Sequence, residues 1–273
     1  MHLVDMHCHL DLMANGPAVA AQAATVGLGI LNAGVTPDAF RAARAAYANA
    51  PTARCAAGLH PWWIDDGRCG AADVDLLVEE LARTPFVGEV GLDFAARHRA
   101  SAPAQTEAFE RIAKACADHP LPKRLLTIHA VHAASTVLDI LERYDLTRSA
   151  ACIIHWFSGT SDELARARRL GCLFSVNEFM LATRRGREYA RQIPTDRLLF
   201  ETDLPSHDGP GSAAELMASL ERTLATVAAL KRTEPFTLAN EVCAHSCELL
   251  DLHGATPEPT PTETAAPSTN EAV

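Results

Sequence analysis

Two histidines stand two positions apart near the start of the chain, in the stretch VDMHCHLD. In an extended strand successive side chains alternate between faces, so Asp5, His7 and His9 are expected to point one way. The residues between them, Met6 and Cys8, then point the other way. This geometry can offer two imidazoles to one metal ion. The alternative is a buried strand whose histidines make ordinary hydrogen bonds, and the stretch by itself leaves both open.

Further metal-binding and proton-handling side chains follow other short apolar runs. Histidines and carboxylates are ligands for divalent ions such as Zn, Mn or Mg. The residues of this kind that follow these runs outnumber the ligands of one tetrahedral ion. Two ions about 3.5–4 Å apart can orient a hydroxide and stabilise both oxygens of a displacement, which is hydrolytic chemistry. Taken singly, each residue can also be a helix cap or a core histidine. The set stands at the ends of six of eight strand candidates: His7 and His9, His60, Glu89, His129, His155, and Asp203.

Two ions in one site need a ligand that bridges them. Some metal-dependent barrels use a carbamylated lysine at a strand end for this purpose. The lysines of this chain, Lys114, Lys123 and Lys231, all stand elsewhere. Glu89, at the end of the fourth strand candidate, is therefore the best bridging candidate.

Short β-rich runs alternate with segments of helical period, which favours parallel strands joined by crossover helices. Eight such units close a (β/α)8 barrel, in which the carboxyl ends of the strands converge on the active-site face. We predict an α/β fold of this TIM-barrel type over residues 1–252 and a disordered Pro/Thr/Glu-rich tail over 253–273. The strand candidates are 3–9, 27–34, 54–59, 86–92, 125–130, 151–157, 172–177 and 198–203. The helical patterns run over 37–48, 73–83, 104–118, 134–144, 161–170, 212–231 and 237–251.

The amino-acid composition limits which binding partners and which cellular compartment are expected for the protein. The net charge of −10, from 34 acidic and 24 basic side chains, argues against coating duplex nucleic acid by broad electrostatics. A phosphate-bearing substrate must then be held locally. No signal peptide and no run long enough to span a membrane is visible, so we expect a cytoplasmic protein without a membrane partner. The eight cysteines form no CxxC pair and are expected to be reduced thiols.

Six linked motifs over residues 3–250, the third followed by Gln105 and Phe109, resemble those of the TatD family of metal-dependent deoxyribonucleases. The resemblance implies a (β/α)8 barrel that hydrolyses phosphodiester bonds in DNA, often from a strand end. It also implies one ion held by His7, His9, Glu89 and Asp203, and a second held by Glu89, His129 and His155. A finer similarity, in IIHWFSG and GCLFSVNEFML, is to the QatD-like branch of antiphage gene clusters, which implies partner proteins of a defence system. The motifs are DMHCHLD, GLHPW, VGEVGLDF with Gln105 and Phe109 after it, TIHAVHA, IIHWFSG and FETDLP.

One position departs from the family pattern. The family usually carries an arginine two residues after the fifth-strand histidine, whereas this chain has Val131 after His129. If that arginine contacts substrate phosphate, Val131 cannot replace it. His132 could compensate when protonated, or it could face solvent at the start of a helix.

The expected mechanism is attack of a metal-bound hydroxide on the phosphodiester phosphorus, with Asp203 accepting the proton of the water. Glu201 and Asp5 are expected either to orient a ligand histidine or to belong to the polar barrel interior. His60 is expected to contact substrate or to structure its loop. Trp62 and its neighbour Trp63 are expected to stack on an unpaired base or to pack on the rim.

Arginines near two strand ends are expected either to supply local positive charge or to lie on solvated surfaces. They are Arg97, Arg99, Arg184, Arg185 and Arg187. Two other functions remain open beside the deoxyribonuclease. One is an amidohydrolase-like C–N or ester hydrolase, against which the missing bridging lysine counts. The other is a weakly active subunit whose metal site mainly supports an assembly.

Overall fold

The computed structural model describes residues 3–205 and 209–252, and within them every predicted strand is present. Most strands are largely apolar and almost fully buried, as expected for parallel strands covered on both faces, whereas Arg54 and Cys55 of the third strand are partly exposed. The strands are β1 (Leu3–Cys8), β2 (Leu28–Ala33), β3 (Ala53–Ala56), β4 (Phe86–Asp93), β5 (Leu125–Val131), β6 (Ala151–His155), β7 (Leu173–Val176) and β8 (Leu198–Phe200).

All strand pairs are parallel and join neighbours in chain order, β1 to β3 in one sheet and β4 to β8 in another. Ala57, just after β3, bridges to Val87 in β4 and connects the two sheets. At the other seam the amide of Asp203 donates to the carbonyl of His7 at 2.9 Å. The strands therefore close into the predicted (β/α)8 barrel.

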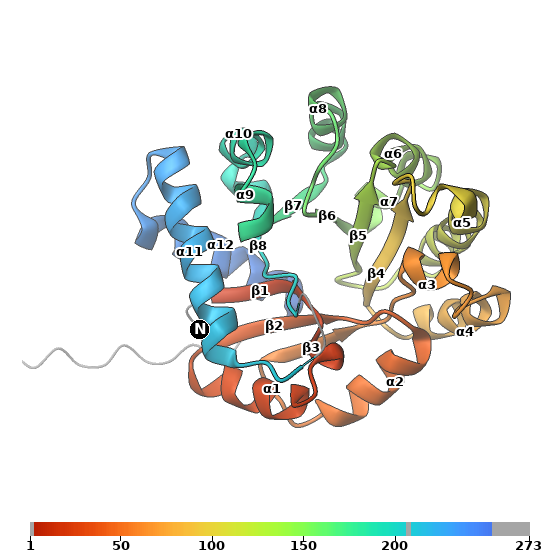
Figure 1. The fold of residues 1–273 in the computed structure, drawn as a ribbon, viewed down its shortest axis with the longest axis horizontal. Helices are drawn as coiled ribbons and strands as arrows, with labels where there is room; N and C mark the ends of the chain where they lie inside the picture. Colours follow the sequence, from red (N-terminus) through yellow and green to blue (C-terminus); the bar gives the residue numbers. More distant parts are fainter. Residues whose placement is uncertain (1–2, 206–208, 253–273) are drawn as a thin grey trace, which may run out of the picture.

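The helices surround the strands (Figure 1). All seven predicted helices are present within a few residues. The sequence pattern did not predict two other helices of similar length, because α1 is rich in alanine on all sides and α10 has very few large apolar residues. The helices are α1 (Gly16–Thr25), α2 (Pro37–Ala46), α3 (Pro61–Asp65), α4 (Ala71–Leu81), α5 (Ala102–Asp118), α6 (Ala134–Arg143), α7 (Leu146–Ser149), α8 (Ser161–Leu170), α9 (Glu178–Leu181), α10 (Arg184–Gln192), α11 (Ala213–Lys231) and α12 (Pro235–Leu250), with 3-10 turns at Leu10–Leu12, Arg99–Ser101 and Thr195–Arg197.

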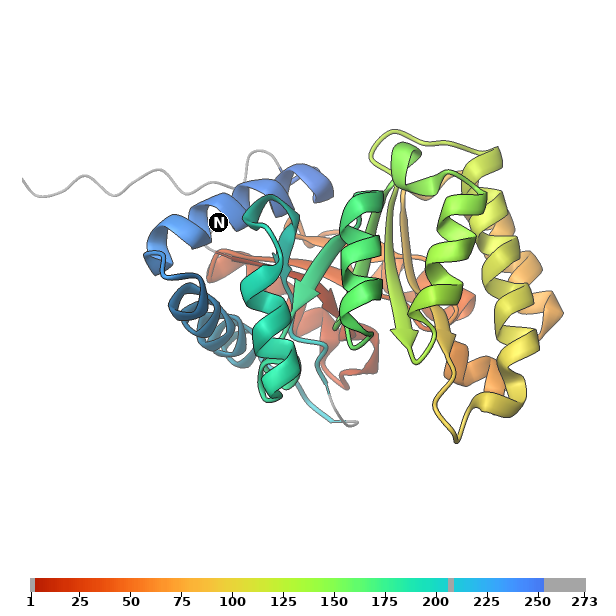
Figure 2. The same ribbon diagram turned by 90° about the horizontal axis from the view of Figure 1, so that it is seen from above.

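The barrel interior is a continuous apolar cluster to which each strand contributes. Leu250 and Leu252, at the end of α12, pack into this cluster at the amino ends of the strands. Figure 2 shows α12 lying across that end of the molecule. The opposite end, at the carboxyl ends of the strands, is therefore left for the polar residues. One member from each strand in order is Val4, Leu31, Ala56, Phe86, Leu125, Ile153, Leu173 and Leu199.

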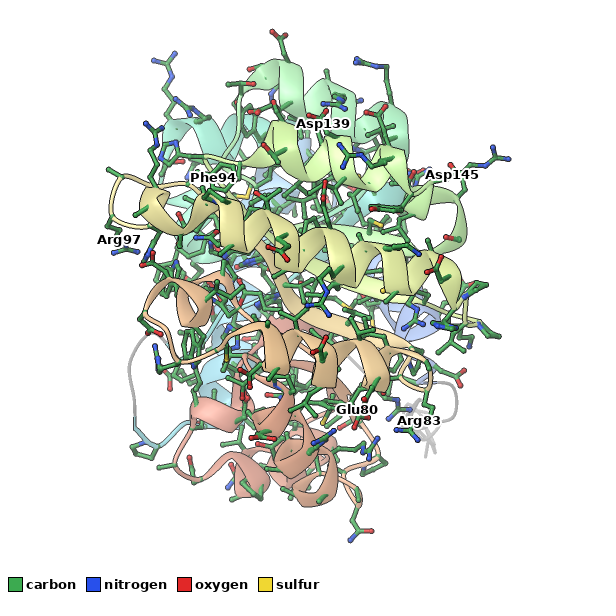
Figure 3. All side chains as sticks on the ribbon, turned by 90° about the vertical axis from the view of Figure 1, so that its right-hand side faces the viewer. Glu80, Arg83, Phe94, Arg97, Asp139 and Asp145 are labelled. Atoms are coloured by element: carbon green, nitrogen blue, oxygen red, sulfur yellow. The ribbon has the colours of Figure 1, made fainter. Side chains whose placement is uncertain are left out.

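Figure 3 displays the two ends of the barrel from the side. Phe94 and Arg97, which follow β4, lie at one end, whereas Arg83 and Asp145, which precede β4 and β6, lie at the other. No helix in the described residues is long and apolar enough to cross a membrane. The predicted disordered tail, 253–273, lies outside the described residues.

The prediction that the side chains of β1 alternate strictly between its two faces was wrong. Met6 packs in the barrel interior, whereas Cys8 packs in the larger cluster between the strands and the outer helices. The register of β1 against β2 shifts between Asp5 and Cys8, and such a shift rotates the side chains that follow it. His7 and His9 nonetheless both reach the same end of the barrel.

Candidate metal centre

The strand ends bring six of the predicted residues into one cluster. His7 lies in β1 and His9 just after it, Glu89 in β4, His129 in β5, His155 at the end of β6, and Asp203 after β8. The four imidazoles and Glu89 are almost fully buried, and the side chain of Asp203 is 17 % exposed. Asp203 is therefore the most exposed member of the cluster, although His9, Glu89, His129 and His155 also line the adjoining pocket.

Glu89 lies at the centre of the cluster and its two carboxylate oxygens face different histidines. Oε2 is 3.3 Å from Nε2 of His7 and 3.4 Å from Nε2 of His9. Oε1 is 2.7 Å from Nδ1 of His129 and 2.9 Å from Nε2 of His155. Burial alone would favour protonation, but the surrounding histidines hold the pKa of Glu89 well below its usual range. An ionised carboxylate thus joins two pairs of imidazoles.

Asp203 completes the half of the cluster that contains His7 and His9. Its Oδ1 is 3.3 Å from Nε2 of His9 and 3.8 Å from Nε2 of His7. The backbone of Asp203 lies in the left-handed region with φ of 57°, a conformation that costs energy in a residue with a Cβ and is frequent at functional sites.

Each of these four histidines has a polar group close to its second ring nitrogen. Such a partner fixes the ring and leaves the first nitrogen to face a cation, which is the usual arrangement around a metal-bound histidine. The donor set and its supports therefore fit divalent ions. The pairs are His7 Nδ1 with Thr127 Oγ1 at 2.6 Å, His9 Nδ1 with the Ala33 carbonyl at 2.8 Å, His129 Nε2 with Asp93 Oδ2 at 3.3 Å, and His155 Nδ1 with Glu201 Oε1 at 3.6 Å.

His60 also reaches Glu89, and a backbone hydrogen bond fixes the tautomer of its neutral ring. Its Nδ1 accepts a hydrogen bond of 3.1 Å from the backbone N–H of Trp62, so the neutral ring carries its proton on Nε2. That Nε2 is 3.1 Å from Oε1 of Glu89. Burial lowers the pKa of His60 to about 4, despite the neighbouring carboxylate, so the ring is neutral at pH 7. His60 is thus a hydrogen-bond donor at the edge of the cluster.

Glu201 lies behind the cluster, as one of the two interpretations of it predicted. This buried carboxylate accepts hydrogen bonds from Ser175 Oγ, from Asn177 Nδ2 at 2.8 Å and from the backbone N–H of Trp156 at 3.1 Å. Its Oε1 also faces His155 Nδ1. Glu201 is therefore placed to orient that ring.

Asp5 has a different position. Its carboxylate accepts hydrogen bonds from the backbone N–H and hydroxyl of Thr202, at 2.9 and 2.6 Å, and from the backbone N–H of His7 at 3.2 Å. Burial raises the pKa of Asp5 to about 7. Asp5 thus connects β1 to the segment after β8, and the hydrogen bonds described for it involve no ligand ring.

Sequence reasoning missed Asp93, the last residue of β4. It accepts hydrogen bonds from Trp62 Nε1 at 2.7 Å and lies 3.3 Å from His129 Nε2. Although burial opposes ionisation, His129 and Trp62 hold the pKa of Asp93 well below its usual range. The signal was present, because Asp93 is an even number of residues from Glu89, but the predicted strand ended one residue too early.

The cluster lies in a pocket of about 780 Å³ whose other walls are largely aromatic and apolar. Trp62 lines it, with His98 stacked at 5.4 Å and the guanidinium of Arg97 at 5.0 Å from its ring centroid. Arg97 lines the pocket as well and is exposed to solvent, so both interpretations of it stay predictions. Val131 and His132 are also pocket residues, and His132 is exposed.

The remaining arginines that were considered lie away from this wall. Arg184 and Arg187 line a second, separate cavity beside α10. Arg185 is exposed on the same helix. These positions agree with the solvated-surface interpretation.

A (β/α)8 barrel with histidines and carboxylates clustered at the carboxyl ends of its strands defines a metal-dependent hydrolase. The family model of TatD-related DNases matches residues 4–251, and the chain belongs to this family. It is accordingly a metal-dependent nuclease that acts on phosphodiester bonds and uses divalent metal.

Alignments with similar proteins cover most of the chain. The 3'-5' ssDNA/RNA exonuclease TatD of Citrobacter rodentium is 27 % identical over 244 residues, which are 86 % of this chain and 91 % of that protein. The enzyme of the same name from Edwardsiella piscicida is 34 % identical over 202 residues, 69 % and 73 % of the two chains. The crystal structure of YJJV, a TatD homologue from Escherichia coli, has a TM-score of 0.75 at 23 % identity and covers 92 % of this chain and 98 % of its own.

These findings confirm the predicted family and enzyme class. The C–N or ester hydrolase alternative is not favoured, and an amidohydrolase structure from Saccharomyces cerevisiae at 17 % identity shares the fold alone. The QatD-like branch and the partner proteins of a defence system stay predictions.

Proposed function

We propose that this protein removes nucleotides from the ends of single-stranded DNA with the help of two divalent ions, Mg, Mn or Zn. His7, His9, Glu89 and Asp203 would hold one ion; Glu89, His129 and His155 would hold the other. The observation that carries the proposal is the position of Glu89, whose two oxygens each face a different pair of imidazoles. When bound, the ions supply positive charge that acidifies water and stabilises the charge of the reacting phosphate.

The side chains of the pocket then have distinct tasks. Asp203 is the exposed carboxylate of the cluster and is placed to accept a proton from the attacking water. His60 Nε2–H can donate to a phosphate oxygen, because burial keeps its ring neutral and its tautomer is fixed by Trp62. Arg97 is the only Lys or Arg among the described residues that line this pocket, and it is the candidate to replace the charge that Val131 lacks.

The shape and charge of the molecule support a chain end as the substrate. A pocket of about 780 Å³ is suited to a few nucleotide-sized groups rather than to a duplex. A net charge of −10 argues against broad electrostatic binding of duplex DNA. The relatives from Citrobacter rodentium and Edwardsiella piscicida are named as 3'-5' exonucleases of single-stranded DNA and RNA.

The test compares metal-stripped protein with and without added Mg, Mn or Zn on end-labelled single- and double-stranded DNA. The control is a His7→Ala/His9→Ala double variant whose fold is verified by circular dichroism. We expect metal-restored shortening of single strands by the wild type alone, with two ions per chain at saturation. Absence of cleavage with every ion, despite bound metal, would contradict DNA as the substrate; one ion per chain would contradict the two-ion centre.

A further inference from the structure

Two exposed aromatic rings stack on each other at the wall of the metal pocket. Trp156 and Phe179 are 36 % and 40 % exposed, with ring centroids 5.3 Å apart and planes at 21°. Both residues line the pocket that contains the candidate metal ligands. Only four large apolar side chains in the described part of the chain are exposed to this degree, and these two gather at the site.

The pair is held in place by the chain around it. Trp156 directly follows His155, and its backbone N–H donates to Glu201. Phe179 lies in the short helix α9, where Asn177 caps the backbone N–H of Met180 at 2.8 Å. The pair is thus organised before any ligand binds.

Helix α9 is also tied to the outer layer of the barrel. Glu178, the residue before Phe179, accepts hydrogen bonds from Arg222 and Ser219 of α11, each at 2.7 Å. On the other side of Phe179, Met180 and Leu181 are buried in the core. Phe179 therefore projects outward from a segment that is anchored on both sides.

The tryptophans that sequence reasoning selected for base stacking are less suited to it. His98 stacks on the ring of Trp62, Arg97 lies over it, and its N–H is bonded to Asp93. The guanidinium of Arg68 lies 4.0 Å from the ring centroid of Trp63. Both rings already pack against cationic or aromatic neighbours, so their main contacts are with nearby side chains of the protein.

We propose that Trp156 and Phe179 form a platform on which an unpaired base of the substrate stacks beside the scissile phosphate. The inference rests on the proposed nuclease function and adds a requirement for an unstacked base. Aromatic rings accept every base through its π-face, whereas a base inside a duplex is already stacked on its neighbours. Because Trp156 is adjacent in sequence to the ligand His155, the stacked base belongs to a nucleotide next to the reacting phosphate.

The test combines ring deletion with base deletion. Wild type, W156A, W156F and F179A are compared on single-stranded oligonucleotides that carry one abasic site at successive positions from the cleaved end. KM and kcat are measured at saturating metal, and Kd by fluorescence anisotropy of labelled oligonucleotides. The control variant is F236A, because Phe236 is 77 % exposed on α12 and does not line the pocket.

We expect W156A to raise Kd and KM for intact single strands by about 5- to 150-fold, the range for loss of one base–aromatic stack. F179A should have a smaller effect, W156F should retain most of the affinity, and F236A should match the wild type. One abasic position should weaken wild-type binding as much as W156A does. At that position the two changes should not add, because they remove the same contact.

Two results would overturn the platform. One is a W156A variant with wild-type Kd and KM. The other is a loss of affinity in W156A that adds to the loss caused by the abasic site at every position, because additivity indicates a structural effect of the substitution. The nuclease proposal fails separately, if the wild type cleaves no oligonucleotide. In that case the Kd values alone still decide whether the base stacks on Trp156.

Discussion

Replacing Glu201 by glutamine should weaken metal binding while leaving the barrel intact. Glu201 is fully buried and faces Nδ1 of His155 at 3.6 Å. The amide can turn its oxygen toward Asn177 and the backbone of Trp156 and its NH2 group toward Ser175. The hydroxyl of Ser175 can rotate to accept that hydrogen bond. The substitution thus keeps the network and removes only the charge behind the ring.

The size of the effect follows from that lost charge. A carboxylate behind a metal-bound histidine raises the basicity of the ring, and losing such a partner typically costs 10–100-fold in metal affinity. We therefore expect about 1.4–2.8 kcal/mol less binding free energy for the ion at His129 and His155. The ion at His7 and His9 has other supports, Thr127 and the Ala33 carbonyl, and should be affected less.

The assay is the cleavage rate of a single-stranded oligonucleotide as a function of metal concentration, alongside calorimetric titration. The E201Q curve should shift to about 10–100-fold higher metal and reach a similar plateau. Glu188, an exposed glutamate paired with Arg191 on α10, provides the matched control E188Q, which should not shift. An unshifted E201Q curve would refute the reasoning, and so would a low plateau that excess metal does not restore.

Three further predictions concern the pocket and the ions. D203N should abolish turnover with an unchanged circular dichroism spectrum, and retained activity would remove Asp203 from proton transfer. R97Q should raise KM about tenfold and lower the slope of binding affinity against salt concentration by about one charge. Adding V131R to that variant should restore part of the lost affinity. Equal salt slopes for R97Q and the wild type would exclude a phosphate contact. Chelation should lower Tm by about 10–20 °C relative to protein with metal at a hundredfold excess over Kd for both ions, measured by calorimetry.

The parallel strands were predictable because most of them are covered on both faces and appear in the sequence as short apolar runs. The clustering of the candidate ligands was predictable from the same boundaries, since a barrel brings its strand ends together. Helix α10 was missed for the opposite reason: its sequence, RRGREYARQ, offers few large apolar residues to mark a buried face. Its burial is limited to small contacts such as Gly186 and Ala190 beside Tyr189.

Other features depend on contacts between distant residues and could not be read from a pattern. The shift in β1 that separates Met6 from Cys8 is set by pairing with β2. The tautomer of His60 depends on the backbone N–H of Trp62, which becomes available only once α3 has formed. Likewise, the choice between tryptophans for a base depends on which rings already have neighbours.

The chemistry and the proposed substrate contact share one support. Oε1 of Glu201 accepts a hydrogen bond from the backbone N–H of Trp156 and lies 3.6 Å from Nδ1 of His155, so a single carboxylate lies beside two consecutive residues. Asn177, which also donates to Glu201, caps the helix that presents Phe179. A change in Glu201 that moves His155 therefore moves the aromatic platform with it. Because a misplacement of about 1 Å can cost a hundredfold in rate, we expect this linkage to keep a stacked base in register with the phosphate at the proposed metal centre.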